Sequence, residues 1–339
     1  YIVCGFGNTG SMIVKGLLKR GISAVILERK QEIIHGMALD DDFSHLPALA
    51  GDVTDRRLLE LAGLENKRCL GVMAITNEDH ANLTIAITSK LLRPELPVFA
   101  RSETRRVSAN MASFGIEHRI DPYTIFAERF YLALSSPTKY LVQDWLIGVP
   151  GSELRTEIKP PPGRWIIAGL GRFGSRIAPQ LNQAGLPFTI IDVHPDRVEK
   201  REDAVLGRGT EAHTLMEAGV KEAVGIIAGT GDDVDNLSII MTARELNPDL
   251  FIVVRQENQQ NDALFDSFKA DLVARRSLIV ARRILMVATT PLLPAFLTHL
   301  VREDEAFAAK VKNRLEAVLH GHAPNLWTEE LIAGHANAF

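Results

Sequence analysis

The stretch "VCGFGNTG" at residues 3–10 is a short apolar strand that runs directly into a glycine-rich turn. The same arrangement returns as "IAGLGRFG" at residues 167–174. Both stretches contain G-x-G-x-x-G, in which the first glycine makes a tight turn, the second lets the backbone approach a pyrophosphate, and the third lets helix and strand pack closely. Each copy therefore predicts a strand, a phosphate-binding turn and a helix whose N-terminus faces the phosphates.

An acidic residue ends the next apolar run in both copies, Glu28 after "AVIL" and Asp192 after "FTII". A carboxylate there accepts hydrogen bonds from ribose hydroxyls, and this context strengthens a glycine motif that is weak on its own. Because a carboxylate repels a 2′-phosphate, it favours NAD or an adenine nucleotide over NADP. The alternative is that the glycines serve only the fold and that the clefts hold no ligand.

Similarity between the two copies continues in order along the chain. "GDVTDRRLLELAG" resembles "GRGTEAHTLMEAG", "TNEDHANLTIA" resembles "TGDDVDNLSII", and "VFARSE" resembles "IVVRQE". Strand-like and helix-like patterns alternate, which predicts a parallel sheet with helices on both faces. The pattern returns from about 164 to 274. In the first copy the strands are expected near 1–5, 24–28, 46–50, 70–75, 97–101 and 117–120, and the helices near 9–20, 30–38, 54–63, 77–92 and 104–114.

Composition excludes several classes of protein. A formal net charge of −4 gives no reason to expect nucleic acid as a partner. Two cysteines, Cys4 and Cys69, indicate neither a disulfide framework nor a zinc site. Residues 284–301 lack charged side chains, but Pro291 favours a helix that ends before it and a second element after it over a membrane span. No signal peptide is visible, and the abrupt first strand suggests a piece of a longer protein.

The run of motifs "GFGNTG", "GDVTD", "TNEDHANL", "ARSE" and "FGIEHRIDP" resembles the RCK domain, the regulator of potassium conductance, also called TrkA-N or KTN. The resemblance covers about 1–135 and 164–285. It implies a Rossmann-like lobe followed by a crossover helix, which "DPYTIFAERFYLAL" and "ARRSLIVARRIL" would form. It also implies a nucleotide ligand, NAD(H) or alternatively ATP, ADP or AMP, and calcium in some members.

The predicted fold class is α/β, with two Rossmann-like doubly wound parallel-sheet lobes in tandem, each followed by a crossover helix, and a partly helical C-terminal tail. The prolines before Gly163 mark the boundary between the lobes. A helix is expected near 303–319 in the tail. The predicted divisions are a first lobe at 1–136, a linker at 137–163, a second lobe at 164–288 and a tail at 289–339.

Two tandem copies resemble the cytoplasmic gating module of a prokaryotic potassium channel. The resemblance implies a nucleotide-sensing role at the cytoplasmic face of the cell membrane, with a pore domain in the same longer chain or in a partner subunit. It also implies a homo-oligomer, from a dimer to a tetramer or an octameric ring of lobes. The alternatives are a regulatory subunit of a potassium transporter, which the short stretch between the lobes disfavours, a subunit with a purely structural nucleotide, and an NAD-dependent oxidoreductase.

No catalytic residue is predicted, because none of the four histidines of the first copy lies in a recognisable pattern. Arg101 and Arg255 end the fifth strands, where either a phosphate contact or a salt bridge to a neighbouring acid would explain them. The predicted nucleotide-binding residues are Gly5, Phe6, Gly7, Asn8, Thr9, Gly10, Glu28, Arg29, Asp52, Val53, Thr76, Asn77 and Arg101 in the first lobe, and Gly169, Gly171, Arg172, Phe173, Gly174, Asp192, Thr230 and Arg255 in the second.

The two lobes are not expected to be equivalent. The "GD-x-T" of the first lobe becomes "GRGT" in the second, so that Arg208 stands where the first lobe has Asp52. This reversal of charge predicts that the first lobe is the better nucleotide site. Residues 40–42 form an acidic loop that could ligate calcium, but no metal ligand set is predicted. Apolar residues on more than one face of 77–92 predict a subunit interface.

Overall fold

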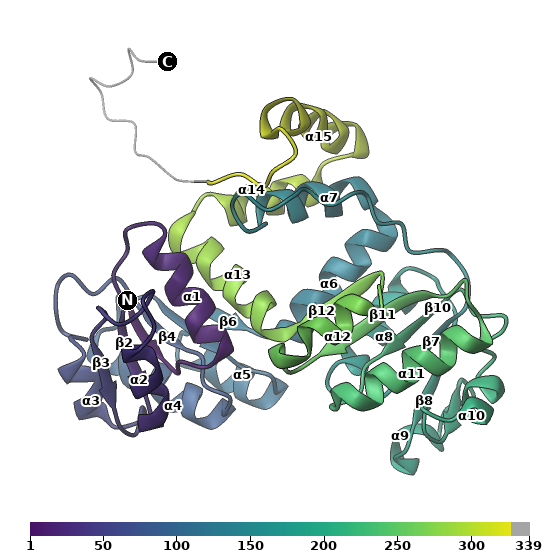
Figure 1. The fold of residues 1–339 in the computed structure, drawn as a ribbon, viewed down its shortest axis with the longest axis horizontal. Coiled ribbons are helices and arrows are strands. Elements are labelled where there is room, and N and C mark those ends of the chain that lie inside the picture. The colour runs from purple at the N-terminus through teal and green to yellow at the C-terminus, as the bar shows by residue number, and fades with distance from the viewer. Residues whose placement is uncertain (327–339) are drawn as a thin grey trace.

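The computed structural model describes residues 1–326, which form two six-stranded parallel sheets with flanking helices (Figure 1). The strand orders are β3-β2-β1-β4-β5-β6 and, read from the other edge, β9-β8-β7-β10-β11-β12, so the two lobes share one topology. The strands are β1 Ile2–Cys4, β2 Val25–Glu28, β3 Ala48–Ala50, β4 Val72–Ala74, β5 Val98–Arg101, β6 His118–Ile120, β7 Trp165–Ala168, β8 Phe188–Asp192, β9 Ala204–Leu206, β10 Gly225–Ala228, β11 Phe251–Gln256 and β12 Leu272–Arg275.

The predicted fold class of two Rossmann-like lobes is confirmed, since the strand order reverses between β1 and β4 and between β7 and β10. Residues of β1, β4, β7 and β10 are all buried, because helices cover both faces of each sheet. The helices of the first half are α1 Asn8–Leu18, α2 Gln31–Ala38, α3 Arg56–Leu61, α4 Asp79–Leu92, α5 Arg105–Ser113, α6 Pro122–Ser135 and α7 Pro137–Leu146. Those of the second half are α8 Gly174–Gln183, α9 Pro195–Val198, α10 Ala212–Glu217, α11 Asp233–Leu246, the 3₁₀ turn η1 Gln259–Asn261, α12 Asp262–Ser267, α13 Arg276–Thr289, α14 Leu293–Arg302 and α15 Glu305–Leu319.

The helix that follows each lobe packs on the other lobe (Figure 1). Helix α6 leaves the first lobe, and its Phe130 packs edge-on against Trp165 of β7, with ring centroids 5.4 Å apart. Helix α13 leaves the second lobe, and its Ile284 lies in the core of the first lobe with Ile13 and Val14 of α1. The two lobes therefore complete each other's cores.

Local sequence explains where these exchanged helices begin. Asp121 caps α6, its carboxylate accepting hydrogen bonds from the backbone N–H groups of Tyr123 (3.0 Å) and Thr124 (3.3 Å). Pro122 occupies the first turn, where no N–H is needed. The same carboxylate accepts a hydrogen bond from Arg176 Nη2 of α8 at 2.9 Å, so the cap also fixes α6 to the second lobe.

A helical cap, formed by α7, α14 and α15, covers the exchanged helices (Figure 1). The helix predicted near 303–319 is confirmed as α15. Helix α7, however, lies within 137–163, which the sequence describes only as a linker, and its Val142 is fully buried. The divisions between domains remain a prediction. Residues 327–339 of the predicted tail lie outside the described residues.

Helix α13 ends at Thr289, before Pro291, and α14 begins at Leu293, as the prolines predict. Among the described residues no single helix is long and apolar enough to cross a membrane. Helices α13 and α14 together meet the criteria of length and composition, but they are bent by 109° relative to each other.

Helix α4 buries Leu83 and Ile85 against the first sheet and leaves Leu91 72% exposed. A single exposed leucine is ordinary on a protein surface, so this side chain alone does not indicate a contact with another subunit. The subunit interface predicted for this helix stays a prediction.

The exchange of helices predicts that a substitution in α13 destabilises the first lobe. Ile284→Ala is expected to lower the free energy of unfolding by about 2–5 kcal/mol, because it leaves a cavity among buried residues. Native-state hydrogen exchange should show the loss in β1 and β2. Leu292→Ala, at a side chain that is 67% exposed, is the control. Loss of protection confined to β7 and β8 would contradict the exchange.

Candidate functional site

The glycine turns have the geometry that the motif requires. Gly5 has a φ of +103°, a value that L side chains rarely adopt. A Cβ on Gly10 would lie 2.2 Å from the carbonyl oxygen of Gly5, so any side chain there would separate α1 from β1. A Cβ on Gly7, by contrast, would meet nothing within 4 Å. The second glycine thus faces open space, where a ligand can approach the backbone.

The second lobe repeats this geometry. Gly169 has a φ of +100°, a Cβ on Gly174 would lie 2.1 Å from Gly169 O, and a Cβ on Gly171 would meet nothing within 4 Å. No side chain among the described residues caps the first turn of α1 or α8. Ser11 and Ser175 already donate their N–H groups to Gly7 O and Gly171 O, so the N–H groups that precede them are the ones left to solvent or to an anionic ligand.

The acids that end β2 and β8 hold the glycine turns in place. Glu28 Oε2 accepts a hydrogen bond from the N–H of Phe6 at 2.8 Å, and Asp192 Oδ2 accepts one from the N–H of Leu170 at 2.7 Å. Burial raises the pKa of Asp192, but hydrogen bonds from His194 and Leu170 and the charge of Arg197 together leave the pKa below its ordinary value. Asp192 is therefore ionised at neutral pH.

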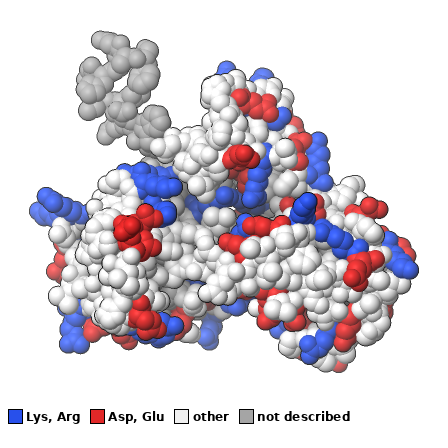
Figure 2. Space-filling model, viewed as in Figure 1, with Lys and Arg blue, Asp and Glu red and all other residues white. Residues whose placement is uncertain are grey.

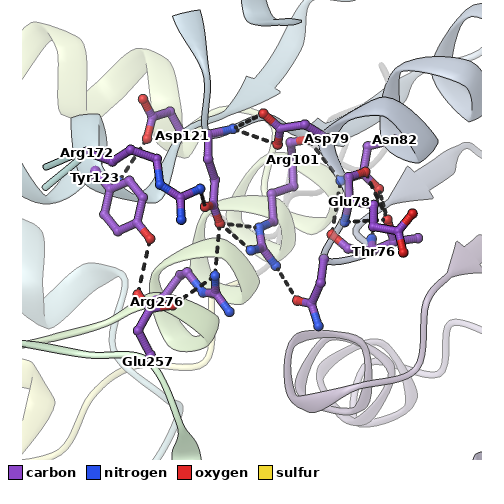
Figure 3. A network of polar contacts seen from close by, with 12 residues as sticks. Thr76, Glu78, Asp79, Asn82, Arg101, Asp121, Tyr123, Arg172, Glu257 and Arg276 are labelled. Atoms are coloured by element: carbon purple, nitrogen blue, oxygen red, sulfur yellow. Dashed lines mark hydrogen bonds and ion pairs between the residues drawn. The ribbon is translucent and has the colours of Figure 1, made fainter. Parts of the chain in front are cut away.

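A threonine and an asparagine form the opposite wall of each cleft. The N–H of Thr76 donates to Asn82 Oδ1 at 2.8 Å, and Asn82 Nδ2 donates to the carbonyl oxygen of Arg101 at 3.1 Å (Figure 3). Thr230 and Asn236 repeat these contacts in the second lobe. Each asparagine is fully buried and joins the ends of two neighbouring strands. Both asparagines lie within motifs that repeat between the two copies, but neither is among the residues predicted to bind the nucleotide.

In the second lobe the predicted residues enclose a cavity of about 200 Å³. Its lining includes Gly169, Gly171, Asp192, Thr230 and Arg255. Arg208 also lines this cavity, at the position where the sequence predicts a change in ligand preference. Most of the residues predicted for the second-lobe site therefore line one cavity.

Contrary to the prediction, Phe173 and Arg172 do not line the second-lobe cavity. Phe173 is fully buried, and its ring packs against Phe126 of α6 at a centroid distance of 5.3 Å. The side chain of Arg172 points away from its own glycine turn, and its Nη1 donates to Glu103 Oε2 of the first lobe at 2.5 Å. Exchange of α6 explains both departures, because this helix brings the first lobe against the second glycine turn.

The other first-lobe residues have separate local roles. Asp52 Oδ1 accepts a hydrogen bond from the N–H of Thr54 at 2.9 Å, and hydrogen bonds from Thr54 lower the pKa of Asp52. Val53 is buried, while Arg29 pairs with Glu78 at 3.3 Å on the surface. Asn77 Oδ1 accepts from Arg101 Nη1 at 3.1 Å. Of these, only Asp52, which is exposed, keeps a carboxylate open to a ligand.

Buried charges join the two lobes beside the clefts (Figure 3). The carboxylate of Glu103, only 4% exposed, receives Arg101 from β5, Arg172 from the second glycine turn and Arg276 from α13. Burial raises the pKa of Glu103, but the charges of Arg101, Arg276 and Arg172 together bring the pKa below its ordinary value. Arg101 therefore forms a salt bridge, one of the two roles left open by the sequence.

The second lobe contributes the matching half of this network. Arg255 Nε donates to Glu257 Oε1 at 2.6 Å, and Arg255 Nη2 donates to the hydroxyl of Tyr123 at 2.7 Å. Arg276 Nη1 lies 2.9 Å from Glu257 Oε2 as well as 3.2 Å from Glu103 Oε1. One guanidinium thus connects the acids of both lobes. The repeated glutamate of "VFARSE" and "IVVRQE" is the sequence signal that could have revealed this pair.

The acidic segments do not form a metal site in the described residues, where no group of three His, Cys, Asp or Glu side chains could hold a metal ion. In the loop at 40–42, Asp42 pairs with Lys15 and Asp40 Oδ1 accepts from the N–H of Asp42 at 2.9 Å. Asp232 caps α11, where Oδ1 accepts hydrogen bonds from the N–H groups of Val234 at 2.8 Å and Asp235 at 3.0 Å. Asp40 and Asp42 thus have protein partners, and calcium binding by residues 40–42 stays an untested alternative.

Two doubly wound sheets, each with a glycine turn and an acid at its carboxyl edge, define a tandem Rossmann-like protein. The chain belongs to the TrkA-N domain family, whose model matches residues 1–122 and 165–275. The GsuK channel bound to ADP has the same fold, with a TM-score of 0.62 at 20% identity over 85% of this chain and 68% of that one. The GsuK RCK domain gives 0.60 at 17% identity over 94% and 84%.

Several curated relatives are potassium transport proteins, while one that is 32% identical over 137 residues is an uncharacterized protein of Methanothermus fervidus. Potassium channel protein 1 of Methanocaldococcus jannaschii is 26% identical over 171 residues, 48% of this chain and 51% of that protein. A Trk system potassium uptake protein TrkA homolog of Pyrococcus horikoshii is 26% identical over 136 residues, 37% of this chain and 60% of that protein. The chain spans about half the length of the two potassium channel proteins it matches.

The buried carboxylate predicts a defined dependence of stability on pH. Because the pKa of Glu103 is lower in the folded state than in the unfolded state, its contribution is complete above the ordinary glutamate pKa and is lost as the pH falls through the folded value. Glu103→Gln is expected to lower the free energy of unfolding at pH 7 by about 3–5 kcal/mol.

Denaturant unfolding between about pH 3 and pH 8 measures this effect. The variant should also lose part of the decline in stability on the acid side. Glu78→Gln is the matched control, because its ion pair with Arg29 is exposed on both sides and should contribute less than about 1 kcal/mol. Equal losses in the two variants would show that the network does not stabilise the fold.

Proposed function

We propose that this chain is the cytoplasmic nucleotide-sensing module that controls potassium flux through an associated membrane pore. The family and the potassium channel and Trk relatives support a role in potassium transport. The observation that carries the proposal is the ion pair between Arg172, in the second glycine turn, and Glu103, in the first lobe. A phosphate in the second cleft would attract the same guanidinium that joins the lobes.

The proposed ligand is NAD(H), with ATP, ADP or AMP as the adenine-nucleotide alternative. GsuK structures bound to NAD and to ADP support this choice, as do the acids at Glu28 and Asp192 next to open glycine turns. We place the better site in the first lobe, because Arg208 lines the second cleft where the first lobe has Asp52.

The proposed mechanism is a shift between two arrangements of the lobes. A ligand can move such an equilibrium only by binding one arrangement more tightly than the other. In the first cleft, a ligand phosphate would compete with Glu103 for Arg101, and in the second cleft it would compete with Glu103 for Arg172, so a ligand in either cleft would act on the carboxylate between the lobes. The module is proposed to act at the cytoplasmic face of the membrane, on a pore in the same longer chain or in a partner subunit, as a homo-oligomer.

An oxidoreductase is the alternative function. A dehydrogenase must hold a substrate beside the nicotinamide and place an acid or base near it. In this chain the partner of each Rossmann-like lobe is another such lobe, and the side chains between them are paired charges. Steady NADH consumption with small alcohols, aldehydes or hydroxy acids would favour the enzyme over the sensor.

Valine at the second glycine of each turn tests the nucleotide sites. Gly7→Val and Gly171→Val should each fill the space of a pyrophosphate without a clash, because nothing lies within 4 Å of either Cβ position. We expect Gly7→Val to weaken NAD or ADP binding by tenfold or more, about 1.4 kcal/mol or greater, and Gly171→Val to have a smaller effect. Isothermal titration calorimetry measures both.

Gly36→Val is the matched control, since Gly36 is exposed in α2 and a Cβ there also meets nothing within 4 Å. Its affinity for nucleotide should equal that of the parent chain. If only Gly171→Val abolishes binding, the proposed order of the two sites is reversed. If neither variant changes binding, the ligand does not use the glycine turns.

A further inference from the structure

A second cavity lies between the lobes and the helical cap, apart from both glycine turns. Its volume is about 1670 Å³, and residues of α6, α7, α13 and α14 form much of its wall. Figure 2 shows Lys and Arg side chains in the hollow beneath the helical cap. No residue of the turns at 5–10 or 169–174 lines it. The cavity is therefore separate from the clefts of the proposed function.

Three arginines and one aspartate form a cluster in this cavity. Arg129 Nη2 of α6 donates to Asp144 Oδ1 of α7 at 2.6 Å, and Arg155 Nε lies 4.0 Å from Asp144 Oδ2. Arg282 of α13 makes no hydrogen bond or ion pair within residues 1–326, and its buried Nε has no acceptor there. One carboxylate thus faces three guanidinium groups.

The environment of Arg282 is unfavourable for its charge. Burial, together with the charges of Arg129 and Arg155 and against the charge of Asp144, lowers the pKa of Arg282 to about 10. Arg129 lies over the ring of Tyr140, 5.1 Å from its centroid, and does not approach a second acid. A buried charge without a partner destabilises a fold unless a ligand or counter-ion compensates it.

Other acids of the cavity are engaged elsewhere. Asp266 binds Arg275, Asp271 Oδ2 accepts the N–H of Ile252 at 2.7 Å, and Glu305 accepts from Ser136. Burial lowers the pKa of Arg283, and the negative charge of Glu128 opposes this effect. Glu153 lies on an exposed stretch of the wall. Within residues 1–326 the three guanidinium groups of the cluster therefore share one carboxylate, that of Asp144, which is paired with Arg129.

We propose that this cavity binds a small molecule that carries a phosphate group, with Arg282 as the main recognition residue. A phosphate dianion matches the excess charge, and guanidinium forks bind phosphate oxygens in pairs. Phe126 and Ile279 give the cavity apolar wall, which suits the organic part of a phosphate monoester. Because α6 and α13 are the exchanged helices, a bound phosphate would contact the two elements that hold the lobes together.

Calorimetry on the full 339-residue chain carrying Gly7→Val and Gly171→Val tests the proposal without interference from the nucleotide clefts. The probes are inorganic phosphate, glycerol 2-phosphate and, as the uncharged control, glycerol. We expect both phosphates to bind and glycerol not to bind. Tighter binding of glycerol 2-phosphate identifies a monoester as the ligand class, whereas equal affinity identifies free phosphate.

Arg282→Gln in this background should weaken phosphate binding by tenfold or more and leave the melting temperature without phosphate equal or higher. Arg155→Gln, at a side chain that is 54% exposed, gives a second variant that keeps the fold and should weaken binding several-fold. Arg302→Gln, at the exposed rim, is the matched control and should bind as the parent does. Absence of phosphate binding, or equal binding in Arg282→Gln and the parent, would overturn the proposal.

Discussion

The arrangement of the two lobes depends on one buried carboxylate. The backbone N–H of Glu103 donates to Asp79 Oδ1 at 2.9 Å, and the carboxylate of Glu103 pairs with three guanidinium groups. Taking a carboxylate out of water is costly unless oppositely charged partners surround it. Those partners come from both lobes and from α13, so the carboxylate is satisfied in one relative placement of the lobes and loses partners in others.

The exchange of α6 and α13 brings these partners together. Each lobe lacks one covering helix of its own and receives it from the other lobe, so the hydrophobic cores and the ionic network are built by the same crossing. A change in the tilt of either helix would alter the packing of one lobe and the charges beside the glycine turn of the other. A ligand bound beside either glycine turn would therefore act on the contacts that set the relative position of the two lobes.

Local patterns were sufficient for much of the fold and of the clefts. The strands, the glycine turns, the acids at Glu28 and Asp192 and the helices α13 to α15 follow from apolar runs, glycine spacing and proline positions, all of which act within a few residues. The placement of Phe173 in the core and of Arg172 on Glu103 did not follow. Both depend on α6 and β5, which are distant in sequence, and no local pattern states which lobe a crossover helix covers.

The distance between the lobes, measured by pulsed electron spin resonance, tests the central claim most directly. Spin labels at Arg57 and Lys221, both exposed and on different lobes, would be introduced as cysteines in a Cys69→Ser background. The account predicts that NAD or ADP shifts the distance distribution, and that Glu103→Gln shifts or broadens it without ligand. An unchanged distribution in both cases, with nucleotide binding verified by calorimetry, would contradict it.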